Sequence, residues 1–173
     1  MIDTKHQRRW LNLAGVGVVV GLIAYALFAQ HVLGLEACPL CIFQRVAFIA
    51  GGLVFLVAGL HRPTGLSVRA YGALGLVANG TGAAIAGRHV YIQNLPADQI
   101  PACGPGFDYI MDAFPLLEAL ELVLTGSGEC AEVVWSFLGL SMPSWAFVWF
   151  VLLGGLAVVA NWAVQPHVTI RIN

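Results

Sequence analysis

Near its start the chain has a long stretch, Trp10 to Leu35, without a single Asp, Glu, Lys or Arg. About 20 apolar helical residues are enough to cross the hydrocarbon core of a bilayer. Similar runs follow at three further places, so the sequence predicts an all-α integral membrane protein, a four-transmembrane-helix bundle. The predicted spans are about 11–28, 40–60, 70–87 and 145–162, within one membrane domain over residues 1–173. The first run is longer than the apolar core of a secretory signal and lacks a convincing cleavage site, so we expect it to be retained.

The composition agrees with this class. Hydrophobic residues make up 59% of the 173 residues and charged residues 10%, with a mean hydropathy of +0.83. Ordinary soluble domains have about 25% charged residues. Gly17 and Gly21 have the spacing of close helix contacts, and we expect them to pack inside the bundle; Ala78, Gly82 and Ala86 repeat that spacing. The sequence shows no basic patch with interleaved aromatics, phosphate-binding loop or Ser-His-Asp spacing, which argues against nucleic-acid binding and hydrolysis.

Two loops on the side away from the termini are predicted at about 29–39 and 88–144. The long one carries Arg88 against seven acidic residues, and Pro and Gly surround Cys103. Between Phe114 and Leu124, leucines recur at helical intervals and glutamates occupy other positions. This pattern is typical of a short amphipathic helix on a membrane surface. We therefore expect a large extracytoplasmic loop that carries an interfacial helix.

The distribution of basic residues predicts the orientation. An even number of spans places both termini and the 62–69 loop on one side. That side holds six of the eight Lys and Arg residues: Lys5, Arg8, Arg9, Arg62, Arg69 and Arg171. By the positive-inside rule this side is cytoplasmic, so all four cysteines fall on the outer, periplasmic side.

Cys38 and Cys41 form a C-x-x-C pair where the second span begins. Redox proteins use this spacing to hold one thiol near another. Arg45 lies one helical turn after Cys41, and helical side chains lean toward the N-terminus. We therefore expect the Arg45 guanidinium to point at the Cys41 sulfur and to favour its thiolate form.

Four cysteines allow three pairings, and the sequence leaves these open. Structural disulfides are a reasonable alternative for Cys103 and Cys130, because closing a loop of about 28 residues contributes roughly 3–4 kcal/mol. A zinc site is not expected, since a second C-x-x-C spacing is absent and an oxidising exterior disfavours thiolate ligands. Thiol–disulfide exchange needs direct attack of one sulfur on another. In a redox protein, electrons would enter at the exposed Cys103 and leave at the Cys38–Cys41 pair, where a quinone is the natural lipid-soluble acceptor.

Three features together resemble the DsbB family over nearly the whole chain. They are Cys38-Pro-Leu-Cys-Ile-Phe-Gln-Arg45 at the opening of a span, the four-span layout, and the segments Ser127–Glu132 and Trp135–Trp145. The family consists of quinone reductases of the bacterial inner membrane that reoxidise DsbA, a periplasmic thiol oxidase. The resemblance therefore implies a quinone-dependent protein disulfide oxidoreductase in that membrane.

The resemblance also implies roles for individual residues. Cys103 would form the mixed disulfide with DsbA, Cys130 would exchange with Cys38, and Cys41 would be the thiolate facing ubiquinone or menaquinone. Arg45 and His89 match positions beside the quinone, although His89 can also be interpreted as an ordinary interfacial histidine.

Two other functions fit parts of the sequence. A quinone reductase similar to vitamin K epoxide reductase also has four spans and a C-x-x-C, but there the motif lies near the end of a later helix. A tetraspan scaffold with structural disulfides would use the cysteines only for stability.

Overall fold

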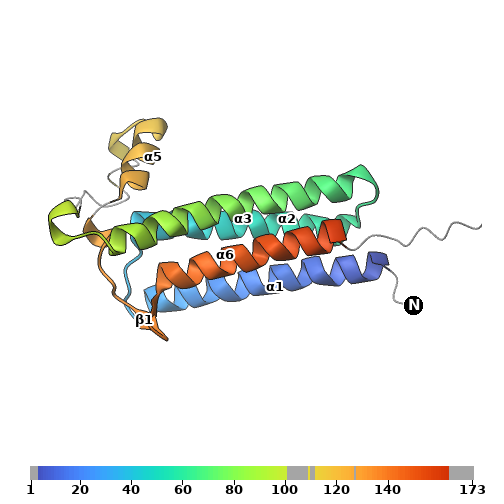
Figure 1. Cartoon of the computed structure of the whole chain (residues 1–173), viewed down its shortest axis with the longest axis horizontal. Coiled ribbons are helices and arrows are strands. Elements are labelled where there is room, and N and C mark those ends of the chain that lie inside the picture. Colours follow the sequence, from blue (N-terminus) through green and yellow to red (C-terminus); the bar gives the residue numbers. More distant parts are fainter. Residues whose placement is uncertain (1–3, 101–108, 110–111, 127, 164–173) are drawn as a thin grey trace, which may run out of the picture.

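The computed structural model describes residues 4–100, 109, 112–126 and 128–163. Its body is formed by four long helices that run side by side (Figure 1). They are α1 (Thr4–His31), α2 (Pro39–His61), α3 (Leu66–Gln93) and α6 (Met142–Val158), which a π-helical turn, η3 (Val159–Ala163), extends. The start of α1 and the end of α6 lie at the same end of the bundle. Cys38, which immediately precedes α2, lies at the opposite end.

The predicted spans 11–28, 40–60 and 70–87 fall within α1, α2 and α3, and the span 145–162 falls within α6 together with η3. Among the described residues, α1, α2 and Met142–Ala163 are long and apolar enough to cross a membrane. The helix α3 covers 70–87 but is not among these three, because its many glycines, with Asn79 and Thr81, lower the hydropathy of this stretch. The prediction of a mainly helical membrane protein is confirmed. The crossing of α3 and the sides on which the loops lie stay predictions.

The ends of α2 follow from its sequence. Pro39 occupies the first helical position, where its missing N–H costs nothing, and Cys38 is the N-cap in an extended conformation. The Cys38 sulfur accepts a hydrogen bond from the backbone N–H of Cys41 at 3.3 Å. At the other end Arg62 adopts a left-handed conformation (φ 52°) and Pro63 follows, so the helix stops there. The first turn of α2 thereby holds the two sulfurs of the motif together.

Aromatic rings pack against glycines in the core of the bundle. The rings of Phe48 in α2 and Phe150 in α6 are stacked, with centroids 3.8 Å apart. Phe150 is 1% exposed and lies directly over Gly82 of α3. On the other side Phe55 packs on Gly15, where an added Cβ would be 3.0 Å from the ring. The absence of a side chain at these glycines allows the helix backbones to approach closely.

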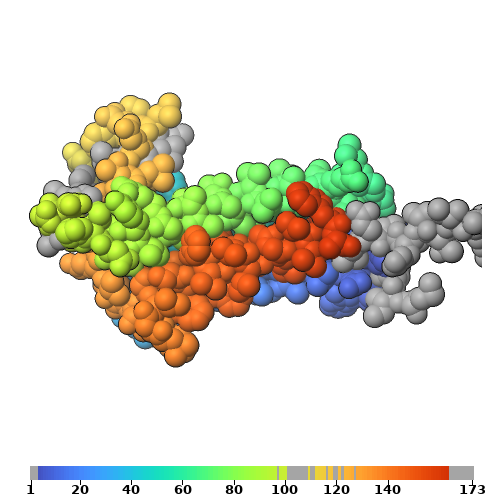
Figure 2. Space-filling view, in the orientation of Figure 1, coloured from blue at the N-terminus to red at the C-terminus, as the bar shows by residue number. Residues whose placement is uncertain are grey.

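The segments between α3 and α6 gather at the Cys38 end of the bundle (Figure 2). They include the 3-10 turns η1 (Ala97–Gln99) and η2 (Gly128–Cys130), and the helix α5 (Leu116–Thr125). The helix α5 begins after Pro115, close to Phe114, where the amphipathic helix was predicted to start. The position of α5 on a membrane surface stays a prediction.

A hairpin, β1 (Ser136–Phe137) and β2 (Leu140–Ser141), was not expected. It pairs Ser136 with Ser141 and Phe137 with Leu140, around a turn with positive φ at Leu138 and Gly139.

Candidate functional site

Three cysteine sulfurs meet at the start of α2. The Sγ atoms of Cys38 and Cys41 are 2.9 Å apart, with the Cys38 thiol as donor and the Cys41 sulfur as acceptor. Cys130, at the end of η2, is fully buried, and its Sγ lies within 4.8 Å of the Cys38 Sγ. The structure therefore brings Cys130, from a distant part of the sequence, to Cys38. Cys103 lies outside the described residues.

The surroundings of Cys38 keep it protonated. This residue precedes α2, and hydrogen bonding to Cys130, then to Cys41, together with burial, raises the pKa of its thiol above the ordinary value. A protonated Cys38 can donate to Cys41, as the 2.9 Å contact requires. Negative charge in this pair is thus best accommodated on the Cys41 sulfur.

His89 of α3 connects this cluster to Gln44 of α2. It is 2% exposed, and its Nε2 lies 3.8 Å from the Cys38 Sγ and 3.1 Å from the backbone oxygen of Cys130. Because a carbonyl oxygen only accepts, Nε2 must carry the proton. In a neutral imidazole Nδ1 is then an acceptor, and the Gln44 amide nitrogen donates to it at 3.0 Å. The buried position of His89 contradicts its interpretation as an ordinary interfacial histidine.

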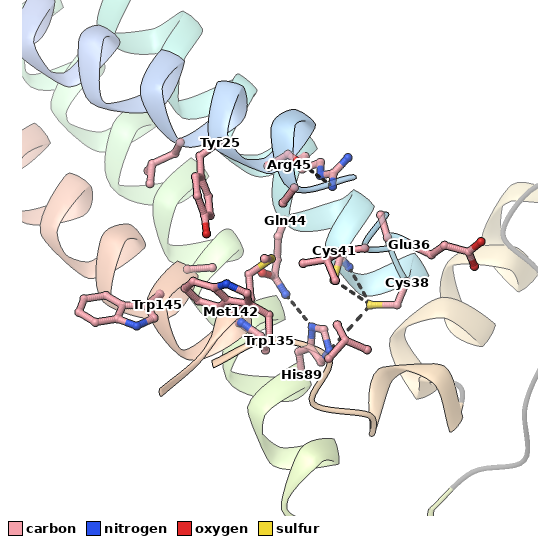
Figure 3. A pocket seen from close by; sticks show the side chains of 18 of the residues that line it. Tyr25, Glu36, Cys38, Cys41, Gln44, Arg45, His89, Trp135, Met142 and Trp145 are labelled. Carbon is pink, nitrogen blue, oxygen red and sulfur yellow. Dashed lines mark hydrogen bonds between the residues drawn. The ribbon is translucent and has the colours of Figure 1, made fainter. Parts of the chain in front are cut away.

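Arg45 does not take the position expected from helical spacing. Its guanidinium donates to the Gln30 side chain and, at 3.3 Å, to the backbone oxygen of Ala26, both in α1. Figure 3 shows this side chain directed toward α1. Oxygen atoms are much stronger acceptors than sulfur, so acceptors on the neighbouring helix determine its direction. The expected approach of the guanidinium to the Cys41 sulfur is therefore corrected: the hydrogen bond to Cys41 comes from Cys38 instead.

A cavity of about 380 Å³ opens beside these residues (Figure 3). Cys38, Cys41, Arg45 and His89 all line it. Much of its wall is apolar and aromatic, contributed by α1, α2, α6 and the segment before the hairpin: Tyr25, Phe48, Trp135, Met142, Trp145 and Trp149. The site is thus a largely apolar pocket with a dithiol and a few polar donors at one side.

Gln44 was not among the residues predicted from the sequence to form the site. It is 5% exposed and lines the cavity. Its position could have been found from spacing, because Cys41, Gln44, Arg45 and Phe48 follow the i, i+3, i+4, i+7 pattern of one helical face. Trp135 lacks such a signal, since it lies in irregular chain before β1.

Replacing Gln44 with leucine should disturb the orientation of the His89 imidazole and the position of its proton. Without the amide donor, the Nδ1 atom loses its partner and the imidazole can rotate or exchange tautomers. We expect Gln44→Leu to slow thiol oxidation about 10-fold, less than the roughly 10²–10⁴-fold of a group that itself transfers a proton, because Gln44 acts only through His89. Turnover of a dithiol substrate as a function of pH measures this, with the exposed Gln99→Leu as control. An unchanged pH profile would contradict the role assigned to the Gln44 amide.

The chain matches known proteins over most of its length. The profile of the family described as disulfide bond formation protein DsbB matches residues 8–160. A disulfide bond formation protein B of Nitrosococcus oceani is 52% identical over 154 residues, 89% of each chain. That of Marinobacter nauticus is 52% identical over 145 residues, 84% of this chain and 86% of the relative. That of Saccharophagus degradans is 53% identical over 143 residues, 83% and 84% of the two chains. The sulfur cluster and the long apolar helices therefore belong to a member of the DsbB family of disulfide bond formation proteins.

Proposed function

We propose that the protein is a protein-thiol:quinone oxidoreductase that reoxidises a DsbA-like periplasmic partner. The observation that carries this proposal is the cluster of the Cys38, Cys41 and Cys130 sulfurs at the edge of a largely apolar cavity. Membership of the DsbB family supports a disulfide oxidoreductase. The DsbA partner and the quinone are the proposed parts.

The exchange steps can be written for the four cysteines. In the resting protein Cys103 is joined to Cys130 and Cys38 to Cys41. A thiolate of the partner attacks Cys103 to form a mixed disulfide and releases Cys130 as a thiolate; the partner's second thiol then resolves this disulfide, leaving Cys103 reduced. The Cys130 thiolate attacks Cys38, forms a Cys38–Cys130 disulfide and expels Cys41 as a thiolate. The proximity of Cys130 to Cys38 fits the second attack.

Neighbouring groups assist the second attack. The N–H on Nε2 of His89 lies close to Cys38 and next to Cys130, so it can stabilise negative charge as it moves from one sulfur to the other. The preference for a protonated Cys38 in the reduced state directs the charge to Cys41. Cys41 is the sulfur left as thiolate beside the cavity.

The residues around the cavity fit a quinone. The volume of about 380 Å³ lies within the range of small-molecule sites, and aromatic walls suit a planar apolar ring. Gln44 and Arg45 bring N–H groups to the cavity, which suit the two carbonyl oxygens of a quinone, and His89 lines the wall beside them. When bound, a quinone would supply a two-electron acceptor. The chain would contribute the apolar walls, the donors and the Cys41 thiolate.

The proposed location is the bacterial inner membrane, with α3 as the fourth span and both termini cytoplasmic. In support, Arg62 and the basic residues of the first turns of α1 lie at the end of the bundle opposite Cys38. The cysteine cluster would then face the periplasm, where DsbA-like proteins operate.

A direct assay tests the function. Purified protein is mixed with a reduced DsbA-like protein and ubiquinone or menaquinone, and the absorbance of the quinone is followed. We expect catalytic quinone reduction, with one quinone consumed per disulfide formed. A scaffold with structural disulfides would show none, and an enzyme similar to vitamin K epoxide reductase would reduce its quinone without preference for the DsbA-like partner.

Arg45→Met should weaken quinone use. The guanidinium is partly buried among α1 acceptors at the cavity wall, and its loss removes both a donor and the hydrogen bonds that join α2 to α1. We expect the KM for quinone to rise about 10-fold, corresponding to about 1.4 kcal/mol of binding. Arg69→Met, an exposed arginine at the start of α3, is the matched control. Equal KM values for the two variants would exclude Arg45 from the quinone site.

A further inference from the structure

Three buried side chains converge on one point beside the cavity. The Sγ atoms of Cys38 and Cys130 and a ring nitrogen of His89 all lie within 4.8 Å of one another. Their residues are 9%, 0% and 2% exposed, respectively. They come from the N-cap of α2, the end of η2 and the last part of α3. Two thiols and an imidazole are a ligand set that zinc prefers.

We propose that the fully reduced protein binds one Zn²⁺ ion through Cys38, Cys130 and His89, and that this binding inhibits it. The inference rests on the proposed function, because turnover is what converts these cysteines to thiols. A cysteine binds zinc as its thiolate, so disulfides at Cys38 and Cys130 remove two of the three ligands. The site is therefore present in one redox state and lost in the other.

The geometry requires only a small contraction. Ligands at the usual zinc distances of about 2.0–2.3 Å are separated by about 3.5–3.8 Å along the edges of a tetrahedron. The Nε2 atom of His89 is already 3.8 Å from the Cys38 Sγ, and no pair in the set exceeds 4.8 Å. Rotations of side chains close the remaining difference. Cys41, with its Sγ 2.9 Å from that of Cys38, is the nearest fourth ligand.

The replacement of two thiol protons by one Zn²⁺ ion suits the buried position of the cluster. Binding to Cys38 and Cys130 releases two protons, forms two Zn–S bonds and leaves the oxidation state of every atom unchanged. One divalent cation thereby replaces two protons, so the net charge of the buried cluster does not change. An isolated buried charge would be costly, and this neutral exchange avoids that cost. The charged side chains that line the same cavity are Glu36, Arg45, Glu129 and Glu132.

Gln44 completes the site as the partner of the histidine ligand. Coordination by Nε2 places the remaining proton of the imidazole on Nδ1. The Gln44 carboxamide lies 3.0 Å from that atom and can present its oxygen instead of its NH₂ group after a half-turn. Histidine ligands usually have such an acceptor, which fixes the ring for the metal.

Coordination would slow the cycle. A thiolate that shares its charge with the metal is a weaker nucleophile, so Cys38 and Cys130 would take part in exchange more slowly while zinc is bound. A second C-x-x-C is not required for this site. The additional ligands come from distant segments that only the fold brings to Cys38.

A binding titration tests the proposal. The protein is reduced, freed of reductant and quinone, and titrated with Zn²⁺ against a chromophoric chelator in detergent. We expect one tightly bound ion per reduced protein and at least 100-fold weaker binding to the oxidised protein. Cys130→Ser and His89→Ala should each weaken binding at least 10-fold, whereas His61→Ala, at the far end of α2, should not. Equal binding by both redox states, or full binding by the Cys130→Ser variant, would overturn the proposal.

Cd²⁺ gives a second, spectroscopic readout. Thiolate coordination produces a charge-transfer absorption in the ultraviolet, and we expect an intensity of at least two thiolates per ion, with two protons released. Cys103→Ser should retain this signal; its loss would assign the metal to Cys103 and overturn the site. Turnover without metal is measured separately. Turnover without zinc binding refutes only this inference, and zinc binding without turnover refutes only the proposed function.

Discussion

The Cys41→Ser variant should lose thiol-dependent quinone reduction and accumulate a disulfide between Cys38 and Cys130. Exchange proceeds only by direct attack of sulfur on sulfur, so serine at this position cannot pass electrons onward. We expect turnover to fall on the order of 10³-fold or more, as for loss of a catalytic nucleophile. Cys38 remains a thiol in this variant, close to Cys130. It can attack Cys130 of the Cys103–Cys130 disulfide and release Cys103 as a thiol.

Peptide mapping under non-reducing conditions checks this result. A cross-linked peptide containing Cys38 and Cys130 should appear in Cys41→Ser and be absent from Cys38→Ser, although both variants lose turnover. Both should also unfold at nearly the same temperature as the parent protein, since a ring of four residues restricts little of the unfolded chain. A large loss of stability with turnover retained would instead support a structural role for the motif.

The Gly82→Ala variant should destabilise the bundle strongly. A Cβ at this position would overlap the Phe150 ring, which is 1% exposed and stacked on Phe48. The ring has no room to withdraw, so α3 and α6 must separate. Overpacking of this kind costs about 1–3 kcal/mol, and we expect the upper part of that range. Unfolding in mixed detergent micelles, followed by circular dichroism, gives the free energy of unfolding.

Gly80 provides the matched control. It lies on the same helix, two residues earlier, and a Cβ there has nothing within 4 Å. Gly80→Ala should leave stability unchanged or raise it by up to about 1 kcal/mol, because alanine favours the helix. If the two variants unfold alike, close packing at Gly82 does not hold α3 against α6.

Much of the fold follows from local sequence. Charge-free runs predict the long helices, and Pro39, Pro63 and Pro115 mark where helices begin or end. The spacing of Ala78, Gly82 and Ala86 anticipates a close helix contact, and Gly82 and Ala86 are buried. These features depend on neighbouring residues, so a single sequence is sufficient to recognise them.

Packing partners were less predictable. Gly17 and Gly21 were expected inside the bundle, yet both are exposed and have no neighbouring atoms within 4 Å of an added Cβ. Gly15 and Gly52 instead meet Phe55 and Val19. All four lie in apolar helices, and the rotation of each helix about its axis decides which glycine faces a neighbour. When nearly every face of a helix is apolar, the hydrophobic pattern does not specify that rotation.

By itself the sequence determined the membrane class, the placement of Cys38 and Cys41 at a helix start, and the family resemblance. These depend on composition, local spacing and short motifs. Only the tertiary structure brought Cys130 and His89 to Cys38, joined Gln44 to His89 and directed Arg45 to α1. Such contacts join segments separated by tens of residues. They depend on how whole helices pack and on which acceptors each polar group finds, information that neighbours in the chain do not carry.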